Sequence, residues 1–422
     1  MTTNLRSVPR SLTTDPRVDR LRKRIITEAK EEQVRSMVRL LDLLIEFACA
    51  SRASDLHVDP GPHKLLIRLR VDGSLDVSLS LPMANHAELV ARLKVLAGLR
   101  TDEHVLPQDG RFRHKISTNE CVDIRISTLP TYYGENAVLR LLRAQSELTT
   151  LGGLGVSEEQ ALLVHSALNR KSGLILVTGP TGSGKTTTLY VLMRMLSECS
   201  LSLVTIEDPL EYELSCATQI PARADIGLTF ARAFRSVLRQ DPDVIMLGEI
   251  RDVETAKLAV HAALTGHLVL SSLHTSDAAS VIPRLMDLGI EPYLIASTLS
   301  LVVSQRLART VCGDCRSEEP LASSMNAVLL QAADCCAPSI QKCAIGRGCI
   351  SCGGSGHRGR VGLYELLPMS VSLEEAVVQR SRSRELRAVA RQDGRCGLVC
   401  DGLAKLAQGR IPVSEVLPLT YA

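Results

Sequence analysis

The sequence predicts an α/β chain in which a parallel sheet is covered by helices on both faces and follows a smaller α+β domain. Three observations lead to this fold class. Within residues 174–195 an aliphatic run, a glycine-rich loop and a helical segment follow one another. Further aliphatic runs then alternate with segments that can form helices, as in a parallel sheet. Before residue 143, strands of alternating polarity surround one amphipathic helical segment.

The 422 residues divide into four predicted regions. Residues 1–35 form a partly disordered N-terminal segment, and residues 36–143 form the α+β domain. Residues 144–155, which are rich in glycine and polar residues, form the linker. Residues 156–422 form the sheet domain, which includes a cysteine-rich insertion over 312–352 and a helical C-terminal tail.

Hydrophobic periodicity places the elements within these regions. The segment over 17–49 is predicted to be helical, because its second half carries an apolar stripe. In the α+β domain the pattern predicts a helix over 85–99 and strands over 65–73, 122–127 and 137–142. In the sheet domain it predicts further strands over 201–209, 243–249 and 267–275.

Composition limits the classes of function. Hydrophobic residues make up 45% and charged residues 23%, which is ordinary for a globular protein. The net charge of +3 and the 3% of aromatic residues argue against a dedicated nucleic-acid binder. Uninterrupted apolar runs are too short for a membrane span, and the N-terminus lacks a hydrophobic signal region. We therefore expect a cytoplasmic protein whose membrane contacts are made through partners.

The glycine-rich loop carries the most specific motif. Gly179, Gly184, Lys185 and Thr186 fit G-x-x-x-x-G-K-[ST] between a strand and a helix. In such a loop, backbone N–H groups converge on phosphates, Lys185 reaches the β- and γ-phosphates, and the Thr186 hydroxyl binds Mg²⁺. The predicted nucleotide-binding residues are Gly179, Pro180, Thr181, Gly182, Ser183, Gly184, Lys185, Thr186 and Thr187. The chain is predicted to bind a nucleoside triphosphate.

Carboxylates follow two of the predicted strands. Glu207, Asp208 and Glu211 follow one strand, where ligands bind in parallel sheets, although a solvated acidic turn is the alternative. Glu249 follows another strand, and Gly248 occupies the position where an aspartate usually holds Mg²⁺. The magnesium role then falls on Glu249 or on Glu207 and Asp208, and one carboxylate remains to orient or deprotonate the attacking water. The sequence leaves the assignment open.

Two histidines lie at the ends of the strand over 267–275. A lone histidine is more often a packing residue, and this alternative applies to both His267 and His274. His274 follows the strand, and its neutral imidazole can donate to the γ-phosphate.

Nine of the thirteen cysteines follow residue 311. Cys312-x-x-Cys315 and Cys349-x-x-Cys352 can face four thiolates towards one Zn²⁺ in a closed, structural site. Disulfides are not expected in a cytosolic protein. The remaining cysteines of this region are interpreted as incidental or packing residues, although the first three could compete as ligands: Cys335, Cys336, Cys343, Cys396 and Cys400.

Four ordered segments resemble a known superfamily. GPTGSGKTTTLY, TIEDPLEY, LRQDPDVIMLGEIRD and GHLVLSSLHTSDA resemble the Walker A, Asp-box, Walker B and His-box motifs of secretion ATPases. These enzymes power type II secretion and type IV pilus assembly. The resemblance runs from about Leu41 to the C-terminus and implies a RecA-like P-loop domain that uses ATP and Mg²⁺. It further implies a homo-hexameric ring, with nucleotide between P-loop and N-terminal domains, and Zn²⁺ on the paired cysteines.

The resemblance extends to the α+β domain. ASDLHVDP, QDGRFRHKI and VDIRISTLPTYYGENAVLRLL are similar to the N-terminal motifs of the family. Arg111, Arg125 and Arg140 match its arginine positions, which implies that they neutralise charge developing on the triphosphate. From the residues alone, arginines that pair with local acids are the alternative.

The resemblance implies a motor that drives pseudopilus or pilus assembly and so type II secretion. Its implied partners are inner-membrane platform and anchor proteins, with the chain peripheral at the cytoplasmic membrane face. Larger members carry an N-terminal docking domain, for which the roughly 35 residues before the family region are too few. The alternatives are a pilus-extension or DNA-uptake ATPase, a P-loop ATPase acting on nucleic acid, and a catalytically silent scaffold.

Overall fold

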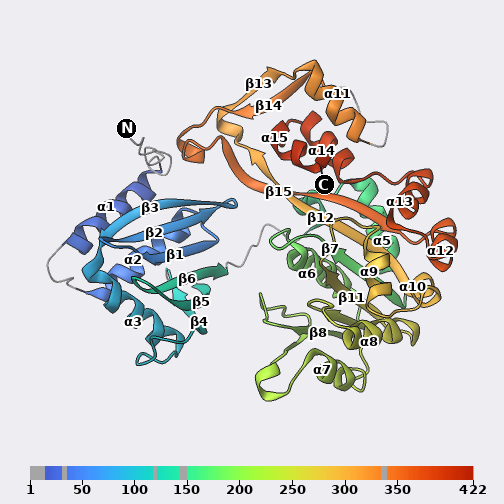
Figure 1. Cartoon of the computed structure of the whole chain (residues 1–422), viewed down its shortest axis with the longest axis horizontal. Coiled ribbons are helices and arrows are strands. Elements are labelled where there is room, and N and C mark those ends of the chain that lie inside the picture. The colour runs from blue at the N-terminus through green and yellow to red at the C-terminus, as the bar shows by residue number, and fades with distance from the viewer. Residues whose placement is uncertain (1–14, 31–35, 117–120, 143–149, 334–339, 422) are drawn as a thin grey trace. The chain divides into compact units, whose positions relative to one another are not determined.

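The computed structural model describes residues 15–30, 36–116, 121–142, 150–333 and 340–421 (Figure 1). Contacts divide the chain into two compact units. The first unit comprises residues 1–144, 311–317 and 346–359, and the second comprises 145–310, 318–345 and 360–422. None of the described helices is both long and apolar enough to cross a membrane.

The first unit contains a six-stranded antiparallel sheet in the order β3-β2-β1-β6-β5-β4. Its strands are β1 (Asp55–Pro60), β2 (Lys64–Val71), β3 (Ser74–Pro82), β4 (Gln108–Lys115), β5 (Cys121–Thr131) and β6 (Gly134–Leu142). Its helices are α1 (Pro16–Lys30), α2 (Met37–Ala50) and α3 (His86–Ala97). The predicted strands over 65–73, 122–127 and 137–142 and the helix over 85–99 are thereby confirmed.

Alternation along the strands gives this sheet one apolar face. In β2, for example, Leu65, Ile67 and Leu69 are fully buried, while Arg68 and Arg70 are partly exposed. The buried residues join apolar side chains of α1, α2 and α3 in one core. The opposite face of the sheet therefore carries the polar and charged side chains.

The predicted helical segment over 17–49 contains two separate helices. The second, α2, has its own N-cap at Ser36, whose hydroxyl accepts a hydrogen bond from the backbone N–H of Arg39. A serine that satisfies a free N–H group favours a helix start at that position. Residues 31–35 lie outside the described part of the chain.

The second unit is built on a seven-stranded sheet in the order β15-β12-β7-β11-β10-β8-β9. The pairs from β12 to β9 are parallel. The strands are β7 (Gly173–Thr178), β8 (Leu203–Glu207), β9 (Thr218–Pro221), β10 (Val244–Leu247), β11 (Leu268–Leu273), β12 (Leu299–Val311) and β15 (His357–Pro368). A separate two-stranded sheet pairs β13 (Arg316–Pro320) with β14 (Lys342–Gly346).

Helices accompany these strands throughout the second unit (Figure 1). They are α4 (Leu151–Leu154), α5 (Glu158–Leu168), α6 (Lys185–Leu196), α7 (Phe230–Val237), α8 (Val253–Leu264), α9 (Val281–Asp287), α10 (Pro292–Thr298), α11 (Ser323–Ala332), α12 (Val371–Val378), α13 (Ser383–Gln392), α14 (Leu398–Ala407) and α15 (Val413–Val416). The parallel sheet with accompanying helices confirms the predicted α/β class.

Strand β7 explains why helices are needed on both faces. All six of its residues are buried. Leu174 and Leu176 belong to one apolar cluster, whereas Ile175 and Val177 belong to another. Successive residues of a strand project to opposite faces, so β7 is packed from both sides and holds the following loop at a fixed place.

Candidate functional site

The glycine-rich loop connects β7 directly to α6, as the sequence predicts. Gly179 and Gly184 have φ values of +146° and +88°, a region that favours glycine. A Cβ atom on Gly179 would lie 2.3 Å from the carbonyl oxygen of Gln305, and one on Gly184 would lie 2.9 Å from its Nε2. Conformation and close packing therefore both require these two motif glycines.

Lys185 begins α6 and its ammonium group turns back into the loop. Its Nζ donates to the carbonyl oxygens of Gly179 at 2.9 Å and Pro180 at 3.1 Å. Burial lowers the pKa of Lys185, and the charge of the Glu249 carboxylate partly opposes this shift. The Oγ of Ser183 is buried and has no hydrogen-bond partner within the described structure. A bound phosphate would satisfy Ser183 and the N–H groups of the α6 terminus, so the loop fits a nucleotide.

The carboxylate and the histidine that the sequence predicts at the ends of two strands lie in contact. Glu249 follows β10 and His274 follows β11, and these strands are adjacent. The Nε2 of His274 lies 3.3 Å from Oε2 of Glu249, while Arg251 donates to the other carboxylate oxygen. Burial raises the pKa of Glu249, but Arg251 and His274 outweigh it and hold the pKa below its usual value. Glu249 is therefore ionised and fixed at neutral pH.

The three carboxylates after β8 are placed in different surroundings. Glu207 is only 2% exposed. It accepts hydrogen bonds from the Tyr190 hydroxyl, from Thr205 Oγ1 at 2.6 Å and from Gln219 Nε2 at 3.2 Å. Its oxygens are thus engaged within the protein. Burial and the Glu207 charge together raise the pKa of Tyr190, so this phenol remains a donor.

The other two carboxylates are more accessible. Asp208 is exposed and Glu211 is half-buried. Asp208 adds to the electrostatic field that stabilises the Arg251 cation, which itself pairs with Glu249. Asp208 therefore belongs to the same charged group as Glu249, whereas Glu207 is directed into the hydrogen-bond network with Tyr190.

Two contributions to this site were missed from the sequence. Thr178 at the end of β7 makes a 2.7 Å contact between its Oγ1 and that of Thr275, and accepts the Thr275 N–H at 3.0 Å. The buried Gln305 of β12 accepts a hydrogen bond from Thr188 Oγ1 at 2.7 Å. No sequence pattern singled out Gln305, because it lies between Ser304 and Arg306 in a strand that also carries other polar residues.

The three predicted arginines lie in one line across the sheet of the first unit. Arg111 of β4 is opposite Arg125 of β5, and Arg125 is opposite Arg140 of β6. We call these three residues the arginine row. Like charges directly opposite each other destabilise a sheet, so the arrangement is one that an anion would stabilise. Their catalytic role stays a prediction.

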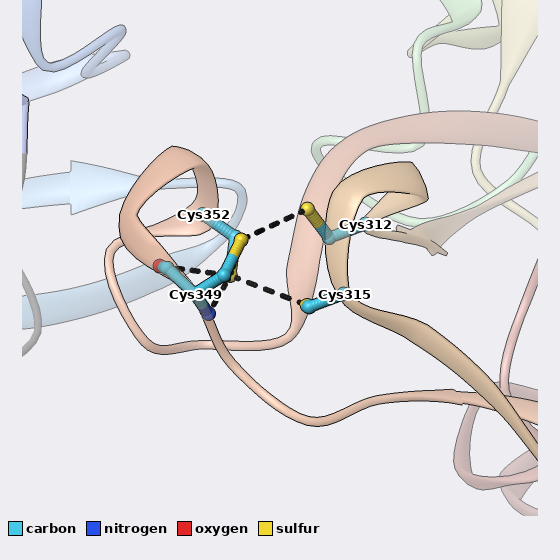
Figure 2. Close-up of side chains that lie close together, drawn as sticks. All are labelled: Cys312, Cys315, Cys349 and Cys352. Carbon is cyan, nitrogen blue, oxygen red and sulfur yellow. Dashed lines mark hydrogen bonds between the residues drawn. The ribbon is translucent and has the colours of Figure 1, made fainter.

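The four predicted cysteines converge on one point (Figure 2). The Sγ atoms of Cys312 and Cys349 are 3.8 Å apart, as are those of Cys315 and Cys352, and all four lie within 4.8 Å of one another. A tetrahedral Zn²⁺ with Zn–S bonds of about 2.3 Å requires sulfur separations of about 3.8 Å. The cluster is compatible with zinc.

Backbone groups favour a thiolate within this cluster. Burial raises the pKa of Cys352, but its sulfur accepts backbone N–H groups from Cys349 at 3.1 Å and Gly356 at 3.2 Å. These bonds outweigh burial and bring the pKa of Cys352 to about 6. A ligand that is ionised at neutral pH suits a cation.

The other cysteines of this region lie outside the cluster or outside the described residues. Cys343 is buried and its Sγ donates to the carbonyl oxygen of Glu319 at 3.7 Å. Cys335 and Cys336 lie outside the described residues. Cys396 is exposed, whereas Cys400 packs against an apolar cluster and is disulfide-bonded. The expectation that disulfides are absent is therefore wrong at Cys400.

Comparisons with known proteins agree with this geometry. The chain matches the family described as "Type II/IV secretion system protein" over residues 30–418. It is 42% identical over 391 residues to the Type II secretion system protein E of Pseudomonas aeruginosa, covering 93% of this chain and 77% of that protein. It is 40% identical over 396 residues to the Type IV pilus assembly ATPase PilB of Myxococcus xanthus, covering 92% and 69% respectively.

Solved structures show the same fold. The pilus retraction motor PilT with bound ADP is 26% identical, with a TM-score of 0.59 over 90% of this chain and 96% of that one. The Legionella pneumophila ATPase DotB is 22% identical, with a TM-score of 0.67 over 93% of this chain and 99% of that one. Because the family match covers most of its length, the chain belongs to the type II/IV secretion system proteins and is an ATPase of that family.

Proposed function

We propose that this ATPase is a motor that drives assembly of a pseudopilus and so powers type II protein secretion. The observation that carries the proposal is the meeting of three elements at one sheet edge: the phosphate loop after β7, Glu249 after β10 and His274 after β11. The Type II secretion system protein E of Pseudomonas aeruginosa, at 42% identity, supports the assignment to secretion.

In the proposed mechanism, the loop from Gly179 to Thr187 binds ATP through its backbone N–H groups and Lys185. Magnesium bound with ATP would neutralise charge on the β- and γ-phosphates, and the Thr186 hydroxyl would hold it. Glu249 orients the attacking water and accepts its proton. His274, beside Glu249, donates to the γ-phosphate oxygens.

The remaining carboxylates have supporting roles in this mechanism. Asp208 and Glu211 would hold water molecules around the metal, a role that requires the exposure to solvent which both keep. Glu207 is a poor candidate for the base, since Tyr190, Thr205 and Gln219 already donate to it. The sequence left open which carboxylate acts as the base, and we propose Glu249.

The assembly is proposed to be a homo-hexamer in which the arginine row acts on the phosphates of ATP. It would lie at the cytoplasmic face of the inner membrane and engage platform and anchor proteins there, with membrane contact made only through these partners. Cys312, Cys315, Cys349 and Cys352 would hold one Zn²⁺. Four thiolates saturate the ion, so its role is structural.

A second candidate from the same family is pilus extension or DNA uptake. The 40% identity to the pilus assembly ATPase of Myxococcus xanthus supports it. An ATPase that acts on nucleic acid has less support, because the net charge is +3 and aromatic side chains for base stacking are scarce.

Two substitutions test the hydrolytic core. Lys185→Ala is expected to abolish ATP binding or turnover, and Glu249→Gln to retain ATP while losing at least about 100-fold in turnover. Phosphate release and filter binding of labelled ATP measure the two effects. Glu254→Gln is the matched control, since Glu254 is an exposed carboxylate paired with Arg235. Native turnover by Glu249→Gln would transfer the role of base to another carboxylate.

A further inference from the structure

The line of the arginine row continues across β1 and β2. Arg140 lies opposite Asp55, and Asp55 lies opposite Arg70. Residues directly opposite each other project from the same face of a sheet. The next residues along, Leu56 and Leu139, are fully buried in the apolar core on the other face. One carboxylate therefore lies between two arginines on the polar face.

Asp55 is held much more firmly than the arginine beside it. Its side chain is 10% exposed, whereas that of Arg140 is 59% exposed. Asp55 Oδ2 accepts a hydrogen bond from Ser54 Oγ at 2.8 Å. Its Oδ1 accepts from Nε of Arg140 at 3.3 Å, and its Oδ2 lies 3.5 Å from Nε of Arg70. A fixed carboxylate thus contacts two guanidinium groups at their inner nitrogen.

Contact at Nε leaves the two terminal nitrogens of a guanidinium group, Nη1 and Nη2, available; we call this pair the fork. The terminal nitrogens of Arg140 make no hydrogen bond within the part of the chain that the structure describes. Arg70 differs, because its Nη1 donates to the carbonyl oxygen of Gly73 at 3.1 Å. Two free terminal nitrogens in a fixed plane match two oxygens of a phosphate group.

We propose that Asp55 is a positioning residue that orients Arg140, so that its two terminal nitrogens receive the oxygens of a nucleotide phosphate. The proposal rests on the proposed function, in which the arginine row acts on ATP. A free arginine samples many rotamers, so holding Arg140 in place before binding lowers the entropic cost of binding.

The carboxylate also has an opposing effect, because a negative charge repels phosphate. In this geometry the orienting effect dominates. Asp55 lies between Arg70 and Arg140, which match its charge, and its side chain is 10% exposed, whereas that of Arg140 is 59% exposed. Removing the Asp55 carboxylate is therefore expected to lower ATP turnover.

A double-mutant cycle on ATP turnover by the full-length protein tests this. Asp55→Asn should lower kcat/KM about threefold to tenfold, as expected for a partly exposed charged hydrogen bond. Arg140→Ala should lower it at least as much. Since Asp55 acts through Arg140, the double variant should match Arg140→Ala within about twofold. Arg140→Lys keeps the charge without the fork and should lose as much as Arg140→Ala.

Asp76→Asn is the matched control, because Asp76 is an exposed aspartate on β3 of the same sheet and is expected to keep native turnover. Turnover by Asp55→Asn at or above the native value, or additive losses in the cycle, would overturn the proposal. If thermal melting shows that Asp55→Asn does not fold, Arg140→Lys decides, and native turnover by that variant overturns it. Lys185→Ala tests the proposed function separately from the role of Asp55. Residual ATP hydrolysis by this variant would contradict the proposed function itself.

Discussion

The phosphate loop and the arginine row place positive charge in different ways. The predicted nucleotide site of the loop consists of consecutive residues, Gly179 to Thr187, and Lys185 already donates to the carbonyl oxygens of Gly179 and Pro180. The arginine row takes one residue from each of three strands, and register alone brings them together. A local site is specified by a continuous motif, whereas a row across a sheet is specified by pairing between distant segments.

The two regions also differ in how they are supported. The loop lies against Gln305, whose carbonyl and amide groups approach the two motif glycines, so steric contact fixes its shape. The arginine row is supported by charge, since Asp55 contacts Arg140 and the Asp123 carboxylate acts electrostatically with Arg111. The loop therefore has no room for an added atom where it contacts Gln305, whereas the arginine row depends on the charge of each neighbouring carboxylate.

The largest effect is expected for Gly184→Ala. The new Cβ would lie 2.9 Å from Gln305 Nε2 at a φ of +88°, so the loop must move. We expect ATP binding, measured by calorimetry, to weaken about 100-fold, an effect of about 2.7 kcal/mol. Gly182→Ala is the matched control, since Gly182 has a φ of +78° and its new methyl group would meet nothing within 4 Å. Equal losses of ATP affinity in both variants would show that the positive φ alone, and not the contact with Gln305, is responsible.

Loss of the zinc cluster is expected to act on stability rather than on hydrolysis. Cys349→Ser should abolish zinc binding, measured by elemental analysis, and lower the melting temperature by several degrees, with turnover changed less than about threefold. Cys343→Ser is the control, because Cys343 is buried but outside the cluster. Less than about a tenth of an equivalent of zinc in the native protein, with the four thiols freely titratable, would rule out the site.

Gln305→Ala should have a moderate effect on the loop. It removes the acceptor of the Thr188 hydroxyl and the amide beside Gly184. A buried hydrogen bond of about 1 kcal/mol predicts a roughly fivefold weaker affinity for ATP. Gln408→Ala, at the C-cap of α14, is a control at an exposed glutamine. An unchanged affinity in Gln305→Ala would show that the backbone alone supports the loop.

The smallest predicted effect concerns pH. Burial, followed by the charge of Asp277, raises the pKa of Glu365 from 4.5 to about 7, and its Oε2 accepts the Ala278 N–H at 3.4 Å. The folded state holds this proton more tightly than the unfolded state does. The free energy of unfolding should therefore fall as pH rises from about 4.5 to about 7 and then stay level.

Because Glu365 keeps some contact with solvent, the effect is discounted to about 1 kcal/mol. Glu365→Gln should be more stable than the native chain at pH 8 and should lose this advantage at pH 4.5, as measured by urea denaturation. Glu374→Gln, at an exposed position on α12, should show no such difference. A pH-independent difference in Glu365→Gln would contradict the assignment.

Sequence patterns were most informative where structure is local. The aliphatic run, the glycine loop and α6 follow one another along the chain, so β7 and its motif were predicted together. The paired cysteines were predicted because each pair is separated by two residues, which fixes half of the ligand set locally. The strand ends likewise predicted that Glu249 and His274 each follow a strand, whereas the adjacency of these two strands is seen only in the structure.

Contacts that join distant segments were not predicted from pattern. The burial of Glu207 depends on Tyr190 of α6, which is 17 residues away in sequence. The contact of Asp55 with Arg140 spans 85 residues. Gln305 meets Thr188 across 117 residues. Periodicity reports which face of an element is buried, but not which distant side chain lies opposite it.

A mixing experiment with Arg125→Ala and Lys185→Ala tests most directly whether the two regions act together on ATP. Each variant alone should lose most ATP turnover, Arg125→Ala by about tenfold or more, with its fold retained. If the arginine row of one subunit acts on ATP held by the phosphate loop of another, mixed assemblies contain some sites with both groups intact. Mixing is therefore expected to restore part of the phosphate release. Native turnover by Arg125→Ala alone, or full activity in a monomer of verified size, would contradict it.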